Sequence, residues 1–372
     1  MRILVAAQEA PPLLGGPSTW LLDLLQALRP LHQVGLLVPH GRDLAVFERA
    51  GVAPVFLAPS LTSDDPREAA RIAAEIASFT RRQEVDLVHL AGAPLAHLAP
   101  ALAEAGIPSV LTLLGGGDSP RGVSTVGDAP MRVTAVSRTA AAGVTDLVIP
   151  PGGDLDRFQP GDRAEARRAL DLPLGRPVLL MIGRLLVSKG ALEALEALRD
   201  LADLDPLLVV AGDGPDARRI DARVRFLGLE DRVRRTGAVA AEEIPRLYQA
   251  ADLVLLPARD EAAAGLGLAA IEAAACALPM VASSEGALAE VVEDGRTGLL
   301  VPARDARALA AAVRALLADP ARASALGREA RRRAEEAFGR DLAAERYAEV
   351  YREAASGAPL SPHPPAPSPG TG

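Results

Sequence analysis

Position 189 holds the single lysine of a chain with 40 lysine and arginine residues. Ile182-Gly183-Arg184 precedes it and reads as a strand end and a glycine turn, and Gly190 follows it at a predicted helix start. A compact ammonium suits a phosphate pocket, and the free amides at a helix start attract anions. We therefore predict that Arg184 and Lys189 bind a diphosphate; a solvated lysine at a helix end is the alternative.

A second candidate is Glu272, which lies in an otherwise apolar helix predicted over 268–275. A buried carboxylate needs a polar partner, and a ribose diol is one such partner. Two glycines, Gly265 and Gly267, precede this helix and allow a ligand to approach the backbone. We predict a ribose contact for Glu272; capping a helix or bridging two lobes is the alternative.

Weaker signals come from glycines and histidines near predicted strand ends. Gly15 and Gly16 precede a predicted helix N-terminus, an arrangement that tolerates anions. Gly212-Asp213-Gly214-Pro215 is typical of a tight turn. His40, His89 and His97 are more often packed or surface residues than bases, so none is assigned as a general base.

The elements that must position these residues form two series of alternating strands and helices. The first series ends in a predicted strand over 147–149, and a helical stretch predicted over 321–355 closes the second. Such alternation predicts parallel sheets covered by helices on both faces, which bind ligands beyond the carboxyl ends of their strands. We expect an α/β chain with two Rossmann-like doubly wound domains facing across a cleft: an N-terminal domain over 1–150, a linker over 151–161 and a C-terminal domain over 162–338. A helix over 339–355 should return to the first domain, and 356–372 should be a disordered tail.

Composition excludes several classes of function. The net charge of −8 disfavours nucleic acid as a partner. The single cysteine, Cys276, excludes an intrachain disulfide and a cysteine metal cluster. We found no apolar run long enough for a membrane span and no secretory leader, so we expect a cytoplasmic protein.

Taken together, these motifs resemble the group-1 retaining glycosyltransferases, family 4, which have the GT-B fold. The resemblance covers nearly all of the predicted folded chain. Its anchors are Gly15-Gly16, Val85-Asp86-Leu87-Val88-His89, Ala135-Val136-Ser137, the segment 149–160, Gly183-Arg184 with Lys189-Gly190, Gly212-Asp213-Gly214-Pro215, the segment 251–257, Glu272-Ala273 and the segment 290–302.

The resemblance implies a metal-independent, retaining transfer of sugar from a nucleotide-diphosphate sugar to a carbohydrate, lipid or small-molecule acceptor, without a cofactor. It places the donor in the second domain and the acceptor in the first. The implied contacts are Arg184, Lys189 and Gly16 for the donor diphosphate; Glu272 for the ribose; Gly265, Leu266, Gly267 and Leu268 for the donor sugar; Gly183, Gly212 and Gly237 for the nucleotide pocket; and Gly15, His89 and Gly115 on the acceptor side.

The chain departs from the family pattern at two positions. Ala264 stands where the family usually has a glutamate, eight residues before Glu272, and Leu114 stands where it commonly has a histidine. In one interpretation Glu261 supplies the missing acid and the segment Gly115–Gly117 supplies backbone amides in place of the histidine, so that transfer persists with an altered donor preference. In others the chain is a nucleotide-sugar-binding scaffold without efficient transfer or, less favoured, a sugar-nucleotide epimerase of the same fold.

Overall fold

The computed structural model describes residues 1–8, 16–39, 47–48, 51–55, 60–63, 65–115 and 131–357. These residues form two compact units: unit 1 comprises 1–152 and 340–357, and unit 2 comprises 153–339. The first break between the units therefore falls inside the segment 151–161. Of the tail predicted over 356–372, residues 358–372 lie outside the described residues. Ser356 is the last residue of a helix.

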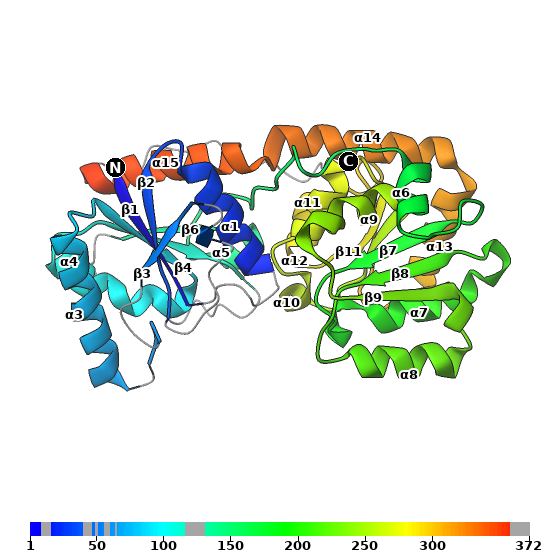
Figure 1. Ribbon diagram of the computed structural model, residues 1–372, viewed down its shortest axis with the longest axis horizontal. Coiled ribbons are helices and arrows are strands. Elements are labelled where there is room, and N and C mark those ends of the chain that lie inside the picture. Colours follow the sequence, from blue (N-terminus) through cyan, green and yellow to red (C-terminus); the bar gives the residue numbers. More distant parts are fainter. Residues whose placement is uncertain are drawn as a thin grey trace. The chain divides into compact units, whose positions relative to one another are not determined.

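Unit 1 contains a parallel sheet with the strand order β3-β2-β1-β4-β5-β6 (Figure 1). Its described elements are β1 (Arg2–Ala7), α1 (Gly16–Leu28), β2 (Gln33–Leu37), β3 (Ala53–Val55), α3 (Pro66–Arg82), β4 (Leu87–Ala91), the 3-10 helix η1 (Ala93–Leu98), α4 (Ala99–Glu104), β5 (Ser109–Leu113), β6 (Met131–Ala135), α5 (Arg138–Ala141) and α15 (Arg340–Ser356).

Helix α15, although it comes last in the chain, packs on α1 and on the sheet of unit 1. Tyr347 and Tyr351 on α15 are fully buried: the ring of Tyr347 contacts Trp20 of α1 and stacks on the ring of Tyr351. Aromatic side chains of this size bury a large apolar area, so they fix α15 to this sheet. The C-terminal helix is therefore part of unit 1.

Unit 2 contains a second parallel sheet, with the order β12-β11-β10-β7-β8-β9. Its described elements are α6 (Arg163–Ala169), β7 (Val178–Ile182), η3 (Val187–Lys189), α7 (Ala191–Asp200), η4 (Ala202–Leu204), β8 (Leu207–Ala211), α8 (Ala217–Leu227), η5 (Glu230–Arg232), β9 (Val233–Gly237), η6 (Ala241–Glu243), α9 (Ile244–Ala250), β10 (Leu253–Leu256), α10 (Glu261–Ala264), α11 (Leu268–Ala275), β11 (Met280–Ser283), α12 (Gly286–Val291), β12 (Leu299–Val301), α13 (Ala306–Ala318) and α14 (Pro320–Ala337).

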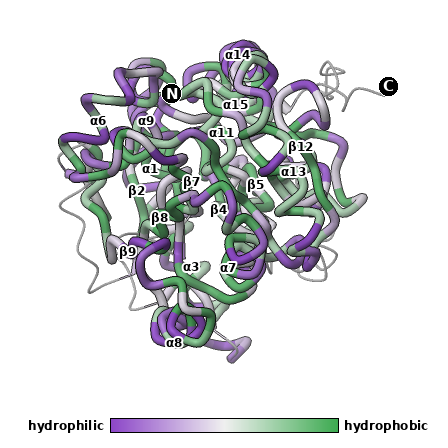
Figure 2. The backbone as a smooth tube through the Cα atoms, turned by 90° about the vertical axis from the view of Figure 1, so that its right-hand side faces the viewer, coloured by the Kyte–Doolittle hydropathy of each residue, from purple (hydrophilic) through white to green (hydrophobic). Residues whose placement is uncertain are grey.

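Both sheets have the doubly wound topology, because renumbering the strands of unit 2 from β7 gives the same order as in unit 1. In unit 2, Leu195 and Leu198 of α7 pack with Leu179 of β7 and Val313 of α13 in one apolar core. Strands β7, β8 and β10 are apolar on both sides, whereas hydrophilic and hydrophobic residues mix along α7 and α8 (Figure 2). This difference follows from helices covering a sheet, with one face of each helix in solvent.

Several elements of the structure differ from the sequence predictions. Residues 147–149, predicted as a strand, form only an isolated bridge between Ala135 and Val148. Helix α8 was not predicted, because only Ile220 and Val224 of this arginine-rich segment are buried. The helical stretch predicted over 321–355 is broken at Gly339, between α14 and α15.

Candidate functional site

The strand order of unit 2 reverses between β7 and β10, where a doubly wound sheet offers a crevice at the carboxyl ends of its strands. The chain leaving β7 crosses the end of β10 at very short range. A β-carbon on Gly190 would lie 1.8 Å from the carbonyl oxygen of Pro257, and Gly190 has φ +84°. Only glycine satisfies both conditions, so it brings the turn η3 directly against the end of β10.

Lys189 is the last residue of η3 and is half-buried. Its ammonium makes no hydrogen bond or ion pair with any residue that the structure describes. Burial lowers the pKa of Lys189, and the nearby charge of Asp260 partly opposes this effect. A desolvated cation without a partner is electrostatically favourable for an anionic ligand.

The neighbouring cation is Arg184, which follows β7 directly and is exposed. Within the described parts of the chain its guanidinium has no hydrogen-bond or ion-pair partner. The backbone beside it is held in place, because the amide of Leu185 donates to the carbonyl of Asp213 over 2.9 Å. Both cations predicted to bind a diphosphate therefore follow β7, at the carboxyl edge of the sheet.

Three predicted glycines also lie at this edge, after β7, β8 and at the end of β9. The amide of Gly212 donates to Gly237 over 2.9 Å, and the amide of Gly183 donates to Ala211 over 3.0 Å. A β-carbon on Gly212 would lie 2.1 Å from the carbonyl oxygen of Gly183. The loops after β7 and β8 thus pack backbone against backbone, and a side chain at position 212 would clash with the carbonyl of Gly183.

The segment from Gly265 to Leu268 joins α10 to α11 on the other side of Lys189. The ammonium of Lys189 lies 3.4 Å from the position of a β-carbon on Gly265. Leu266 and Leu268 are buried, so this segment offers its backbone rather than these side chains to a ligand. Ala264 is 7% exposed and its methyl group packs beside Gly286 of α12.

Glu272 lies on α11, where one carboxylate oxygen accepts a 2.7 Å hydrogen bond from the hydroxyl of Tyr248 on α9. Its second oxygen has no hydrogen-bond partner in the described structure. Burial raises the pKa of Glu272 to about 7, although the hydrogen bond from Tyr248 and the charge of Arg157 lower it. The carboxylate therefore has one oxygen fixed by the protein and one available to a ligand.

Glu261 is exposed at the start of α10 and has no hydrogen-bond partner among the described residues. The adjacent Asp260 caps this short helix by accepting from the amide of Ala263 over 2.9 Å. The capping carboxylate therefore holds its own position, while the side chain of Glu261 extends into solvent.

The acceptor-side predictions in unit 1 have mixed outcomes. His89 is fully buried: Nδ1 lies 2.6 Å from the hydroxyl of Tyr351 and Nε2 lies 2.7 Å from that of Thr112. Burial lowers its pKa to about 3, so it stays neutral. The assignment of His89 to the acceptor side is wrong in this structure, because both ring nitrogens are occupied inside the core of unit 1.

The predicted glycines of unit 1 lie near the ends of its elements. Gly16 begins α1, and Gly115, with φ +75°, follows β5. A β-carbon on Gly115 would lie 3.3 Å from the β-carbon of Ala140, so this turn contacts α5. Leu114 precedes it, whereas Gly15, Gly116 and Gly117 lie outside the described residues.

Sequence reasoning missed the residues that hold these elements in place. Asp216 accepts from the amide of Val187 over 2.7 Å and so fixes the turn that carries Lys189. Tyr248 is the partner of Glu272. The aspartate after Gly214-Pro215 was the one available signal, since aspartates in such turns bind nearby amides.

The described residues contain neither a metal-binding cluster nor a helix that could span a membrane. We found no group of three or more His, Cys, Asp and Glu side chains arranged to hold a metal ion. None of the described helices combines the length and the apolar composition that crossing a membrane requires.

Comparison with known proteins gives matches over most of the chain. A family model described as glycosyl transferases group 1 matches residues 162–333, and one described as Glycosyltransferase Family 4 matches residues 14–157. The chain is 31% identical over 353 residues to a GDP-mannose-dependent alpha-(1-6)-phosphatidylinositol monomannoside mannosyltransferase of Mycolicibacterium smegmatis, covering 87% of this chain and 91% of the relative.

Two further matches are more limited in what they show. A D-inositol 3-phosphate glycosyltransferase of Kineococcus radiotolerans is 41% identical over 228 residues, which are 56% of this chain and 52% of that protein. The crystal structure of Anabaena HepE in complex with UDP and glucose matches with a TM-score of 0.78 over 95% of this chain and 99% of that chain. Its 21% sequence identity supports the fold alone.

Proposed function

The chain belongs to the glycosyl transferases of group 1, and from this premise we propose that it moves a sugar from a nucleoside-diphosphate sugar to an acceptor. In this proposal unit 2 binds the donor and unit 1 binds a carbohydrate, lipid or small-molecule acceptor. Arg184 and Lys189 bind the donor diphosphate, and Glu272 binds the ribose.

The observation that carries the proposal is the unpartnered ammonium of Lys189 at the switch point of the sheet. The ammonium lies beside the backbone at Gly265, and Arg184, which follows the same strand β7, has no ion-pair partner among the described residues. Taking a cation out of water is unfavourable unless an anion accompanies it. A diphosphate supplies that anion and can contact both cations.

The proposed transfer is metal-independent and retains the anomeric configuration. The two cations and the N-terminus of α7 supply positive charge where the departing diphosphate gains negative charge. The bond from the anomeric carbon to the diphosphate oxygen breaks, and the acceptor oxygen forms the new bond on the same face. The departing phosphate takes the proton of the acceptor hydroxyl.

The first donor to test is GDP-mannose, because the relative named for its dependence on GDP-mannose matches about nine tenths of both chains. The HepE protein was crystallised in complex with UDP and glucose, so UDP-glucose is the second donor. Gly183, Gly212 and Gly237 would contribute backbone to the nucleotide pocket.

The decisive experiment is calorimetric binding of GDP-mannose, UDP-glucose and ADP-glucose to the parent protein and to Lys189→Ala. We expect one of the donors to bind and the variant to bind it 10–100-fold more weakly, about 1.4–2.8 kcal/mol. The matched control is Arg225→Ala, which removes an exposed cation of α8 and should leave affinity unchanged. Equal affinity of Lys189→Ala and the parent would refute the proposed diphosphate site. Metal independence is tested separately, and loss of sugar transfer in the presence of a metal chelator would refute it.

A second candidate function, donor binding without efficient transfer, is favoured by one observation. Ala264 stands at the position of the family glutamate, and its buried methyl group packs against Gly286, so no carboxylate comes from this position. Slow hydrolysis of the donor in water distinguishes the two functions. A protein that binds a donor but neither hydrolyses nor transfers it would support the second.

A further inference from the structure

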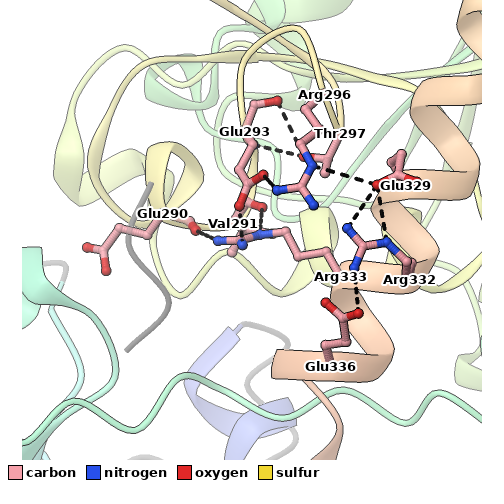
Figure 3. Close-up of polar contacts among 9 residues, drawn as sticks. All are labelled: Glu290, Val291, Glu293, Arg296, Thr297, Glu329, Arg332, Arg333 and Glu336. Carbon is pink, nitrogen blue, oxygen red and sulfur yellow. Dashed lines mark hydrogen bonds and ion pairs between the residues drawn. The ribbon is translucent and has the colours of Figure 1, made fainter. Parts of the chain in front are cut away.

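Arg333 of α14 is 8% exposed; two of its nitrogens bind carbonyls at the C-terminal end of α12 and the third pairs with Glu293, just after this helix (Figure 3). Nε donates to the carbonyl of Val291 over 3.1 Å, and Nη2 donates to the carbonyl of Glu290 over 2.9 Å. Nη1 pairs with the buried carboxylate of Glu293. A cation at this end of a helix satisfies carbonyls that lack intrahelical partners and complements the helix dipole.

Helix α12 in turn packs on the segment that runs past Lys189. A β-carbon on Gly267 would lie 3.2 Å from Cγ2 of Val291, and one on Gly286 would lie 3.2 Å from the β-carbon of Ala264. Val291 and Gly286 are the two ends of α12, so the helix contacts this segment on both sides of Gly265.

These contacts form a continuous path from α14 to the proposed diphosphate site. The guanidinium fixes Val291, Val291 packs on Gly267, and Gly265 lies beside the ammonium of Lys189. Packed side chains transmit small displacements, because protein interiors leave few voids to absorb them.

We propose that Arg333 is a positioning residue for donor binding, which holds α12 against the α10–α11 segment so that its backbone stays beside Lys189. The proposal rests on the proposed function for the identity of the ligand. It assigns a role in ligand binding to a residue that touches neither the donor nor the two predicted cations.

The test compares Arg333→Met with Arg332→Met on the same helix. The side chain of Arg332 is partly exposed and pairs with Glu329 and Glu336 of the same helix (Figure 3). Arg332→Met therefore removes the same charge as Arg333→Met but removes no contact with α12. Glu293 keeps its 2.6 Å contact with Arg296 in the Arg333→Met variant, so its carboxylate is not left unpaired. Arg333→Lys is the second variant, since a single-nitrogen head cannot reproduce the three-nitrogen geometry of a guanidinium.

Two measurements are made well below the melting temperature of each variant: calorimetric dissociation constants for GDP and UDP, and hydrogen exchange of the amides in 261–268. We expect Arg333→Met to raise the dissociation constant of the bound diphosphate about tenfold and to accelerate this exchange, with Arg333→Lys intermediate and Arg332→Met unchanged. A variant that melts earlier but keeps parental affinity and exchange would overturn the proposal. Should Arg333→Met fail to fold, the same two readouts on Arg333→Lys decide.

The outcome separates this inference from the proposed function. If the parent binds neither GDP nor UDP and also fails to bind ADP, the proposed function fails, whereas exchange in 261–268 still reports whether Arg333 holds this segment. If the parent binds and Lys189→Ala weakens binding but Arg333→Met does not, only the positioning role fails.

Discussion

The ammonium nitrogen of Lys189 lies 3.4 Å from the position that a β-carbon would take on Gly265. Gly265 has φ +65° and ψ −141°, a conformation that is essentially restricted to glycine. The only lysine of the chain is therefore placed against a backbone that cannot carry a side chain without strain.

Substituting Gly265 with alanine tests this relationship. We expect Gly265→Ala to destabilise the fold by about 1–3 kcal/mol and to weaken donor binding about tenfold, because the methyl group meets the ammonium and the backbone is strained. Chemical unfolding and calorimetry measure the two effects. Gly175→Ala is the control, since a β-carbon there meets nothing within 4 Å; parental donor affinity in Gly265→Ala would show that this backbone does not form the site.

Part of this site was predictable, because its residues directly follow strands that are consecutive in the sequence. Arg184 and Gly212 follow β7 and β8 in the sequence, and in a parallel sheet all such residues meet at one edge. Lys189 was singled out by composition and lies at the same edge. These inferences need only the order of strands and the residues that follow them.

The order of the strands did not predict which side chains meet between helices or how deeply a side chain is buried. Tyr248 and Glu272 meet across α9 and α11, 24 residues apart, and no periodicity of either helix specifies that pair. His89 lies in a strand that is buried along its whole length, so alternation could not show which way the ring points. The sequence motif around it marks a strand in the family but says nothing about the hydroxyl groups of Tyr351 and Thr112.

The raised pKa of Glu272 predicts that donor affinity depends on pH. Burial raises this pKa to about 7. Only the ionised carboxylate is purely an acceptor, so that its free oxygen can accept from a ribose diol while the other oxygen accepts from Tyr248. We expect affinity to increase as pH rises from 6 to 8, by up to about tenfold per pH unit below 7. Calorimetry across this range should show the dependence in the parent and not in Glu272→Gln; a flat parental profile would contradict a ribose contact through the carboxylate.

The same pKa gives stability the opposite pH dependence. A carboxyl that is more easily protonated in the folded chain contributes stability that is fully present below its ordinary pKa of 4.5 and is lost as pH rises through about 7. The loss amounts to at most about 3 kcal/mol. Urea unfolding measures the free energy of unfolding at pH 5 and at pH 8. The difference between these two values should be smaller in Glu272→Gln than in the parent. Equal differences in the two proteins would argue against a strongly perturbed carboxyl.

Tyr351→Phe tests the buried hydrogen bonds that join α15 to the sheet of unit 1. The substitution removes the hydroxyl that lies 2.6 Å from Nδ1 of His89 and leaves that nitrogen without a partner. We expect a loss of about 1–3 kcal/mol in the free energy of unfolding, because a buried polar atom without a partner keeps its full desolvation penalty. Donor binding, which the proposal places in unit 2, should be unchanged. Unaltered stability would mean that water replaces the hydroxyl.

Glu261→Gln tests whether this residue supplies the acid that Ala264 cannot. The Glu261 side chain is exposed at the start of α10, three residues before Ala264. It has no hydrogen-bond partner among the described residues, so turning it toward a donor sugar breaks no hydrogen bond within them. A side chain that transfers a proton to or from the reacting group raises the rate about 10²-fold or more, whereas a side chain that does not take part leaves the rate unchanged. We expect Glu261→Gln to lower kcat about 100-fold while the donor dissociation constant stays within about twofold. Glu230→Gln, which removes another exposed carboxylate of unit 2, is the control. If Glu261→Gln and the parent turn over at the same rate, Glu261 is not the substitute acid, and the backbone of the Gly265–Leu268 segment must orient the donor sugar without a carboxylate from α10.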